Sequence, residues 1–394
     1  MIRKSCRLLC WLMIPALFGC GKSASRFGAV LPLSGAAAVY GQSIRKGIDL
    51  AYDEIRKNSA YGPVELTVVD SGSDPARAAS ELEKVYDGGA LAAIGGVTSA
   101  EALAMVRVAD KANQVLLSPS ASQPQLTGIS TNFFRVFPSD FAEGTVMAKY
   151  AFDTLKVKTV VILAKQETYA KGIQQVFDEE FRKKGGQVLE LIEFPGNATD
   201  FQALVDRVVT LKPDAAYVAA YTNELSRIIP ELRSQGFAGY ILTTSSFATA
   251  ESVDRTGPAA EGTLFTQSAF DIDDKSPDHV KAFAAGYTAK YGHAPDLYAA
   301  HGYDSLMVLA EAVRQGGKSS SSFWKGMRSI HEFQGVTGTF QFDEKGDVQK
   351  FPHVYVVRDG KSIDVEKERQ KALEEARRKM QEIERQLLEL QRGS

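Results

Sequence analysis

The sequence predicts an α/β protein of two lobes, each with a parallel central sheet, followed by a separate C-terminal helix. From residue 26 onward, short β-branched or apolar runs alternate with longer amphipathic segments, a pattern typical of β-α units. The folded part, roughly 340 residues, exceeds what one hydrophobic core usually serves, so we expect two lobes. From Val365 to Gln391 neither glycine nor proline occurs, which indicates one continuous helix.

The first lobe begins with the run FGAVLPL at residues 27–33. The strands expected after it are VELTVVD, LAAIGG and QVLLSPS, at residues 64–70, 91–96 and 114–120. Amphipathic helices are expected between these strands at residues 42–57, 75–86 and 99–113. Each strand run ends in, or is followed directly by, Ser, Gly, Asp or Pro, residues that favour turns.

A second series of the same kind follows the segment FFRVFPSD. Its helices are expected at residues 141–155, 169–184, 201–211 and 224–235, and its strands at residues 159–166, 187–194, 214–221 and 239–245. YGQSIRKGI in the first series and YAKGI in the second both place a tyrosine just before a helix that contains Lys-Gly-Ile, which favours two similarly wound lobes. Ligands of open α/β sheets bind at the carboxyl ends of strands, so two such lobes facing each other form a cleft.

Three further helices are expected at residues 277–291, 296–315 and 322–330. Residues 337–349 and 352–361 are then expected to pair as a hairpin. The turn DEKGD in the first of these segments lacks the alternating oxygen ligands and the final glutamate of a calcium loop.

The chain starts with the features of a secretory signal peptide. Arg3, Lys4 and Arg7 precede an apolar run at residues 8–18, which is too short to be a permanent membrane anchor of about 20 residues. Leu17-Phe18-Gly19-Cys20 resembles the lipobox of bacterial lipoproteins, so we expect cleavage after residue 19 and a lipid on Cys20. The alternative is ordinary signal-peptide cleavage at a small residue, in which Cys20 carries no lipid. Either way the mature chain keeps one cysteine and no internal disulfide.

Composition and motifs argue against several functions. The chain has 46 basic and 48 acidic residues, a net charge of −2 that does not favour nucleic-acid binding. Its five histidines are scattered without metal-ligand spacing, and it has no nucleophile elbow, phosphate loop or dinucleotide fingerprint. We therefore expect no enzyme activity, no metal and no cofactor.

The C-terminal helix carries apolar residues at alternating steps of three and four. They are Leu373, Ala376, Met380, Ile383, Leu387 and Leu390, a heptad seam of roughly three repeats. Three roles stay open for residues 365–391: self-association or partner binding through a coiled coil, docking onto the protein's own surface, or an independent solvated helix.

Hydroxyl-rich sequence follows two strands of the first lobe, as GGVTSAEA and LLSPSASQP. Thr98 and Glu101 have the spacing of a capping box at a helix start, where free backbone N–H groups favour a carboxylate guest. Alternatively, Thr98 or Ser99 only caps its own helix.

Several blocks together resemble the branched-chain amino-acid-binding family, the type I periplasmic binding proteins of ABC importers. The blocks are FGAVLPLSGAAAVYGQSIRKGIDLAYDEI, AAIGGVTSAEALAMVRVADKANQVLLSPSASQPQLT, FFRVFPSD and FDEKGD, and the similarity covers about residues 26 to 360. The resemblance implies two Rossmann-like lobes joined by a three-segment hinge. The resulting division is a signal peptide (1–19), a lipidated linker (20–25), lobe 1 (26–139 with 268–347), lobe 2 (140–267 with 348–363) and the helix (364–394).

The resemblance also implies a ligand site. By position, Ser99 and Ser122 would supply hydroxyls, and Ser120 a backbone N–H, to a ligand carboxylate. Tyr40 and Tyr298 match places that line the side-chain pocket, and Tyr169 and Tyr221 match tyrosines near the ligand amino group. Amino-acid binders place an acidic residue where this chain has Ser245 (or Ser246), and an unpaired buried ammonium is costly. Glu167 could compensate or point to solvent, so a carboxylic acid or an amide is as good a candidate as leucine.

The expected function is a lipid-anchored receptor that delivers an amino acid or carboxylate-like ligand to an ABC permease. It would act on the extracytoplasmic face of a bacterial membrane, in the periplasm or at the cell surface. The alternative is a non-transport envelope lipoprotein of the same fold that senses a ligand or regulates a partner.

Overall fold

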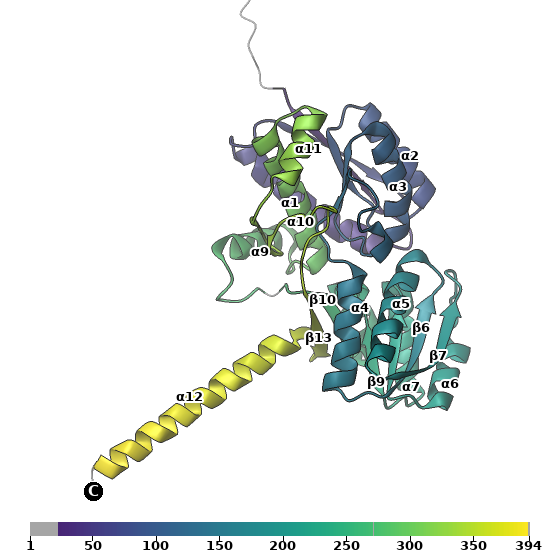
Figure 1. Ribbon diagram of the computed structural model, residues 1–394, viewed down its shortest axis with the longest axis vertical. Helices are drawn as coiled ribbons and strands as arrows, with labels where there is room; N and C mark the ends of the chain where they lie inside the picture. The colour runs from purple at the N-terminus through teal and green to yellow at the C-terminus, as the bar shows by residue number, and fades with distance from the viewer. Residues whose placement is uncertain (1–22, 271, 393–394) are drawn as a thin grey trace, which may run out of the picture.

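The computed structural model describes residues 23–270 and 272–392, arranged as two α/β lobes and a long terminal helix (Figure 1). The expected signal peptide and Cys20 lie outside the described residues. No helix in the described part of the chain is both long and apolar enough to span a membrane. The predicted fold class, two lobes with mainly parallel sheets and a C-terminal helix, is confirmed.

Lobe 1 is built on a parallel five-stranded sheet in the order β2-β1-β3-β4-β5. Its strands are β1 (Ser25–Leu31), β2 (Val64–Asp70), β3 (Ala92–Gly95), β4 (Val115–Ser118) and β5 (Phe133–Arg135). One face packs on α1 (Ala38–Lys57), α9 (Asp278–Tyr291), α10 (Leu297–Gly316) and α11 (Ser320–Arg328). The other face packs on α2 (Pro75–Asp87) and α3 (Ser99–Ala112). Both faces are therefore covered, as the apolar strand runs require.

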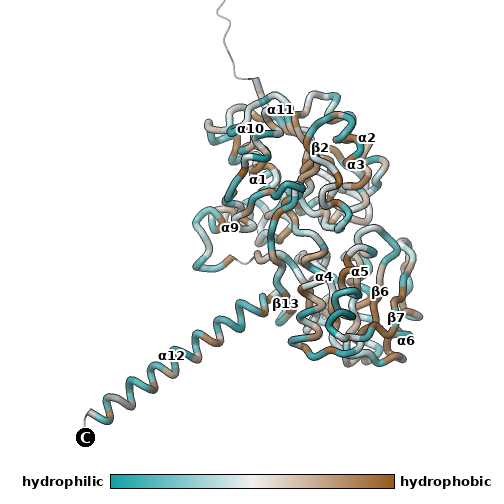
Figure 2. Tube along the Cα trace, viewed as in Figure 1, coloured by the Kyte–Doolittle hydropathy of each residue, from teal (hydrophilic) through white to brown (hydrophobic). Residues whose placement is uncertain are grey.

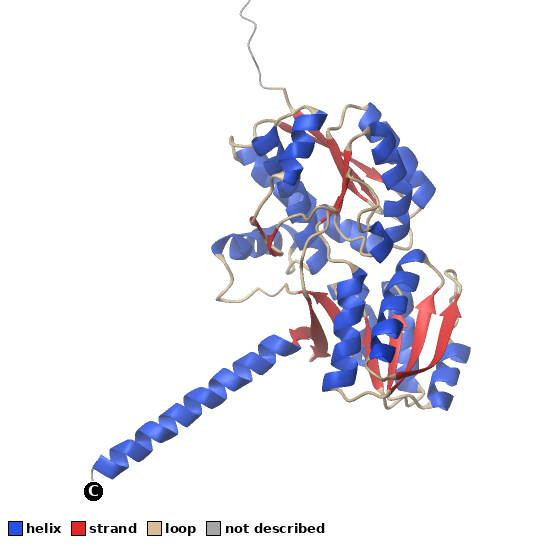
Figure 3. Cartoon of the chain, viewed as in Figure 1, coloured by secondary structure: helices blue, strands red, loops and turns tan. Residues whose placement is uncertain are grey.

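Lobe 2 is built on a seven-stranded sheet in the order β14-β13-β10-β9-β8-β6-β7. Its strands are β6 (Thr159–Lys165), β7 (Gln187–Phe194), β8 (Ala215–Ala219), β9 (Tyr240–Thr243), β10 (Leu264–Ser268), β13 (Pro352–Arg358) and β14 (Lys361–Asp364). Helices α4 (Asp140–Lys149) and α5 (Thr168–Lys183) cover one face, and α6 (Gln202–Leu211), α7 (Thr222–Ser234) and α8 (Ala250–Thr256) cover the other. Figure 3 shows both sheets sandwiched between helices.

Three crossings connect the lobes. The chain passes from β5 to α4, returns between β10 and α9, and crosses again between β12 (Gly338–Phe340) and β13. Together these three connections form the hinge between the lobes.

The expected hairpin between residues 337–349 and 352–361 is wrong. Strand β12 pairs with β11 (Phe333–Gly335) in lobe 1, whereas β13 enters the lobe-2 sheet antiparallel to β10 and β14. The DEKGD turn packs against β5, where Gly346 has a φ of +82° and an added Cβ would lie 2.3 Å from the Phe133 carbonyl oxygen. Asp347 then pairs with the buried Arg135 at 2.7 Å. These lobe-1 contacts prevent the two segments from pairing.

Helix α12 (Val365–Arg392) projects away from lobe 2 (Figure 1). Asp364 caps its start by accepting the N–H groups of Glu366 and Lys367 at 2.9 and 3.1 Å. Figure 2 shows a mostly hydrophilic rod with apolar residues at intervals. Apolar seam residues such as Met380 are exposed, so the alternative in which the seam docks onto the protein's own surface is not what the structure shows.

Candidate functional site

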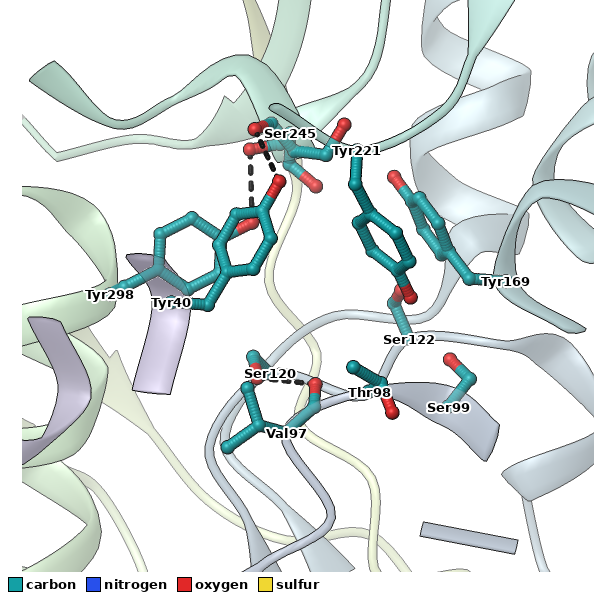
Figure 4. A pocket seen from close by; sticks show the side chains of 11 residues that line it. Tyr40, Val97, Thr98, Ser99, Ser120, Ser122, Tyr169, Tyr221, Ser245 and Tyr298 are labelled. Atoms are coloured by element: carbon teal, nitrogen blue, oxygen red, sulfur yellow. Dashed lines mark hydrogen bonds between the residues drawn. The ribbon is translucent and has the colours of Figure 1, made fainter. Parts of the chain in front are cut away.

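A cavity lies between the lobes at the carboxyl ends of both sheets (Figure 4). Its walls come from Tyr40, Val97, Thr98, Ser99, Ser120, Ser122, Tyr169, Tyr221, Ser245, Ser246 and Tyr298. All eight residues that the sequence singled out for ligand binding are therefore brought to one place, from seven separate segments of chain. Whether each of them contacts a ligand stays a prediction.

The lobe-1 wall is made of small hydroxyl residues at the start of α3. Thr98 caps this helix: its hydroxyl accepts the Glu101 N–H at 3.2 Å, and the Glu101 carboxylate accepts the Thr98 N–H at 3.2 Å. Thr98 therefore caps its own helix, and whether it also contacts a ligand stays a prediction. The Ser99 hydroxyl accepts a hydrogen bond from the Gln123 N–H at 3.3 Å, which leaves its own proton to be donated. A ligand carboxylate placed here would meet that donor and the positive end of α3.

Ser120 and Ser122 follow β4 and complete this wall. The Ser120 hydroxyl donates to the Val97 carbonyl oxygen at 2.7 Å, so this side chain is occupied in holding two loops together. The Ser120 N–H donates to the Ser118 hydroxyl at 3.4 Å, so a ligand role for this backbone group stays a prediction. The carbonyl oxygen of Ser122 accepts the N–H of Asp140 at 2.7 Å, which ties this wall to the first hinge crossing.

The lobe-2 wall is aromatic. The rings of Tyr169 and Tyr221 are stacked, with centroids 5.2 Å apart and planes 15° from parallel. Across the cleft, the ring centroid of Tyr40 lies 5.6 Å from that of Tyr221 and 4.8 Å from that of Tyr298. Burial raises the pKa of Tyr169 and of Tyr221 well above the usual value, so both stay neutral. The buried Tyr169 hydroxyl has no hydrogen-bond partner among the described residues, which leaves a polar group for a ligand.

Hydrogen bonds across the cleft hold the lobes in a closed arrangement. The Tyr40 hydroxyl donates to the Ser246 carbonyl oxygen at 3.0 Å and accepts the Thr222 N–H at 3.0 Å. The Tyr298 hydroxyl donates to the Ser245 carbonyl oxygen at 3.1 Å. In this closed form the cavity has a free volume of about 20 Å³. Because one water molecule needs about 10 to 15 Å³ measured in this way, a larger ligand requires side chains or lobes to move apart.

Two buried acids lie behind the cavity, and the sequence reasoning missed them. Asp140 and Glu143 stand one turn apart on α4 and are fully buried. Glu143 accepts the N–H of Ser245 at 3.3 Å, whereas both Asp140 oxygens lack a hydrogen bond of good geometry within the described chain. Burial raises the pKa of Glu143 to about 7, and burial together with the Glu143 charge raises the pKa of Asp140. Asp140, Glu143 and the buried Met147 are spaced by three and four residues, so they share one face of α4. This helical period could have predicted that the two acids are buried.

The other charged groups near the cavity are already engaged. Glu167 is half-buried and caps α5 by accepting the Ala170 N–H at 3.1 Å, so it does not simply point to solvent. Lys165, whose ammonium lies 5.4 Å from the ring centroid of Tyr221, is paired with Glu224 at 2.8 Å. The lobe-2 side of the cleft is therefore aromatic and bordered by acids rather than by a free cation.

Known proteins share this architecture. The family model for periplasmic binding proteins matches residues 25–361. The leucine-, isoleucine-, valine-, threonine- and alanine-binding protein of Pseudomonas aeruginosa is 24% identical, over 81% of this chain and 86% of its own length. The branched-chain amino acid transporter substrate-binding protein LivJ of Streptococcus pneumoniae, solved with isoleucine, is 30% identical with a TM-score of 0.81, over 86% of this chain and 98% of that one.

A second solved structure shows the same fold at lower identity. The solute-binding protein of an ABC transporter from R. palustris, solved with benzoate, is 21% identical with a TM-score of 0.80, over 87% of this chain and 96% of that one. The two-lobed fold described above is thus shared along almost the whole length of both solved structures. The chain belongs to the periplasmic binding proteins, in the type I group that contains the branched-chain amino-acid-binding proteins.

Proposed function

We propose that this chain is the solute receptor of an ABC importer and binds a small amino acid or a carboxylate-like ligand in the interlobe cavity. Family membership places the protein outside the cytoplasm of a bacterium. The observation that carries the proposal is the lobe-1 wall, where the Ser99 hydroxyl and the start of α3 converge on one buried point. Neutral donors at a helix start bind a carboxylate without a cationic side chain.

Side chains of lobe 2 would determine which other polar or charged group the ligand carries besides its carboxylate. Ser245 carries no charge to pair with an ammonium, but Glu143 lies directly behind it. LivJ was solved with isoleucine, which has both groups. We therefore keep amino acids and their deaminated counterparts as the two ligand classes to be separated by experiment.

Ligand binding would act through hinge closure. The bonds from Tyr40 and Tyr298 to lobe 2 form only when the lobes meet, so a ligand that bridges both walls shifts the chain toward this arrangement. The closed form would be what an ABC permease recognises. We assign no catalytic step to the site; in the described part of the chain, no group of three metal-binding side chains occurs either.

A thermal-shift screen of the chain without residues 1–22 tests this proposal. Amino acids, their deaminated acids and their amides are the ligands, and a binder at a hundredfold excess over its Kd stabilises the fold by about 2.7 kcal/mol. We expect a carboxylate without an α-ammonium to shift the melting temperature at least as much as leucine does.

Two variants test the site within the same screen. Ser99→Ala and Ser122→Ala should each weaken the best ligand by about 1.5 to 3 kcal/mol, because a bond to a charged oxygen is lost. Ser59→Ala, an exposed serine in the loop after α1, is the matched control. No shift with any carboxylate, or a shift unchanged in both cleft variants, would contradict the proposed site.

The membrane anchor is a further part of the proposal. We expect residues 1–19 to be removed and Cys20 to carry the lipid, as the LFGC motif predicts. Cys20→Ser should then move the protein from the membrane to the soluble fraction. Equal solubility of the two forms would reject lipidation while leaving the ligand site untouched.

Helix α12 supports a second candidate function, a non-transport envelope receptor that acts on a partner. It lies beyond residue 361, where the family match ends, and its described side chains from Glu366 onward are exposed. We propose that residues 365–391 mediate self-association in either case. Binding of a small ligand without any effect on uptake in a deletion strain would favour this second function.

A further inference from the structure

Helix α12 presents an apolar stripe that nothing in the described chain covers. Leu373, Met380, Ile383 and Leu390 are 50%, 63%, 56% and 72% exposed. Most helices in proteins owe their stability to packing of their apolar face, and an uncovered helix is marginal in water. The stripe therefore points to a partner other than residues 23–270 and 272–392 of the same molecule.

The spacing of the stripe identifies the partner as another helix with the same repeat. Leu373 and Met380 take the a positions of a heptad, and Ala376 and Ile383 take the d positions. A seam with a 3.5-residue period packs knobs into holes only against a helix of matching period. A second copy of α12 meets this requirement.

Charges beside the seam complement those of a second copy. In the same heptad, Arg377 and Glu384 occupy e positions, and both are exposed. No ion pair within 4 Å engages either residue in the described chain. When two such helices run antiparallel about the centre of the seam, e positions face e positions, so Arg377 meets Glu384 of the second copy twice by symmetry.

The position of the lobes favours the antiparallel direction. Helix α12 follows β14 without a linker, and the seam starts eight residues later, about 12 Å along the helix axis. Axes of paired helices lie about 8 to 10 Å apart. A parallel pair would force two bulky lobes together at that spacing, whereas an antiparallel pair separates them by the helix length of about 42 Å.

We propose that α12 is a homodimerisation helix that pairs antiparallel with α12 of a second copy, with Arg377 opposite Glu384. The two lobe pairs then stand at opposite ends of a short two-helix rod. This inference does not depend on which ligand the cleft binds, because no residue of α12 lines the cavity.

Charge exchange tests the partner and the direction together. The chain without residues 1–22 should sediment as a dimer at micromolar concentration. Arg377→Glu and Glu384→Arg each place like charges in contact and should weaken dimerisation by roughly tenfold or more. The double variant restores opposite charges and should dimerise like the original chain. In a parallel pair Glu384 would instead face Lys379 of the second copy. The Arg377→Glu, Glu384→Arg double variant would then dimerise weakly. The charge exchange Lys379→Glu with Glu384→Lys would restore dimerisation in that case.

Controls separate the seam from the rest of the molecule. Arg378→Glu changes an exposed charge on the outer face of α12 and should leave the dimer unchanged. Met380→Asp with Ile383→Asp should give monomers whose ligand-induced melting shift is retained. A monomeric original chain, a dimer that survives the seam variant, or a double charge variant that stays weak would overturn the proposal.

Discussion

The two walls of the cleft are built from different chemistry although the lobes are wound alike. The lobe-1 wall consists of small hydroxyl residues at a helix start, whereas the lobe-2 wall consists of stacked tyrosines with buried acids behind them. Under the proposed function, the first wall would bind the carboxylate of the ligand. The second wall would select the shape and the charge of the rest of the ligand, so affinity and selectivity would reside in different lobes.

Equivalent tyrosines show the same division. Tyr40 lies on the first helix of lobe 1 and Tyr169 on α5, the helix that follows the first strand of lobe 2. The Tyr40 hydroxyl bonds across the cleft to Ser246 and Thr222, but the Tyr169 hydroxyl has no partner in the described structure. One tyrosine thus stabilises closure, and the other remains available to a ligand.

The largest effect should come from the acids behind the lobe-2 wall. The folded pKa of Glu143, about 7, lies above its ordinary value of 4.5, so the folded state holds a proton that the unfolded state releases between these pH values. Its contribution to stability is therefore complete below pH 4.5 and is lost as pH rises to 7. At about 1.4 kcal/mol per pKa unit, the loss is roughly 3 kcal/mol.

Glu143→Gln should remove this component of the pH dependence. Denaturant unfolding of both proteins at pH 4.5, 6 and 7.5 measures the difference, and Glu179→Gln on the exposed side of α5 is the control. An identical pH profile for the Glu143 variant and the original chain would show that the carboxyl is hydrated in the folded state.

A smaller effect is expected from a charge placed on the lobe-2 wall itself. Ser245→Glu should strengthen the binding of amino acids by about tenfold relative to the binding of their deaminated acids. The new carboxylate attracts the ammonium of an amino acid and repels the negative charge of a deaminated acid. Calorimetric titration of leucine and of its deaminated acid measures the ratio, with Ser245→Gln as a control of equal size. A similar change in the Gln variant would assign the effect to volume, which would contradict the charge-selecting role of this wall.

The smallest effect should come from the bonds that join the walls. Tyr40→Phe removes a hydroxyl that serves two lobe-2 groups and should weaken ligand binding about fivefold, the equivalent of about 1 kcal/mol. Tyr298→Phe removes a single cross-lobe bond and should have a lesser effect. Equal losses would mean that Tyr40 acts as part of the pocket wall rather than in closure.

The family resemblance implied the site residues, and the strand-end rule independently agrees with some of them. Ser99, Ser122 and Tyr221 follow β3, β4 and β8, and in a parallel sheet such ends meet at one edge. Asp140 and Glu143 were not predicted because they lie at the start of a helix whose burial depends on the sheet packed against it. The ion pair between Lys165 and Glu224 was not predicted either, because it joins residues 59 positions apart in the sequence.

The sequence by itself determined the β-α alternation, the positions of most helices and the apolar seam of α12, all of which follow from local periodicity. The residues around the cavity were implied by the resemblance to the binding-protein family, and the rule that strand ends gather at one edge agrees with several of them. Only the tertiary structure decided that β13 inserts beside β10, that Asp140 and Glu143 are buried behind the cleft, and that Tyr40 bonds to Thr222. Each of these features depends on contacts between residues that are distant in the sequence. Neither composition nor hydrophobic periodicity predicts such contacts.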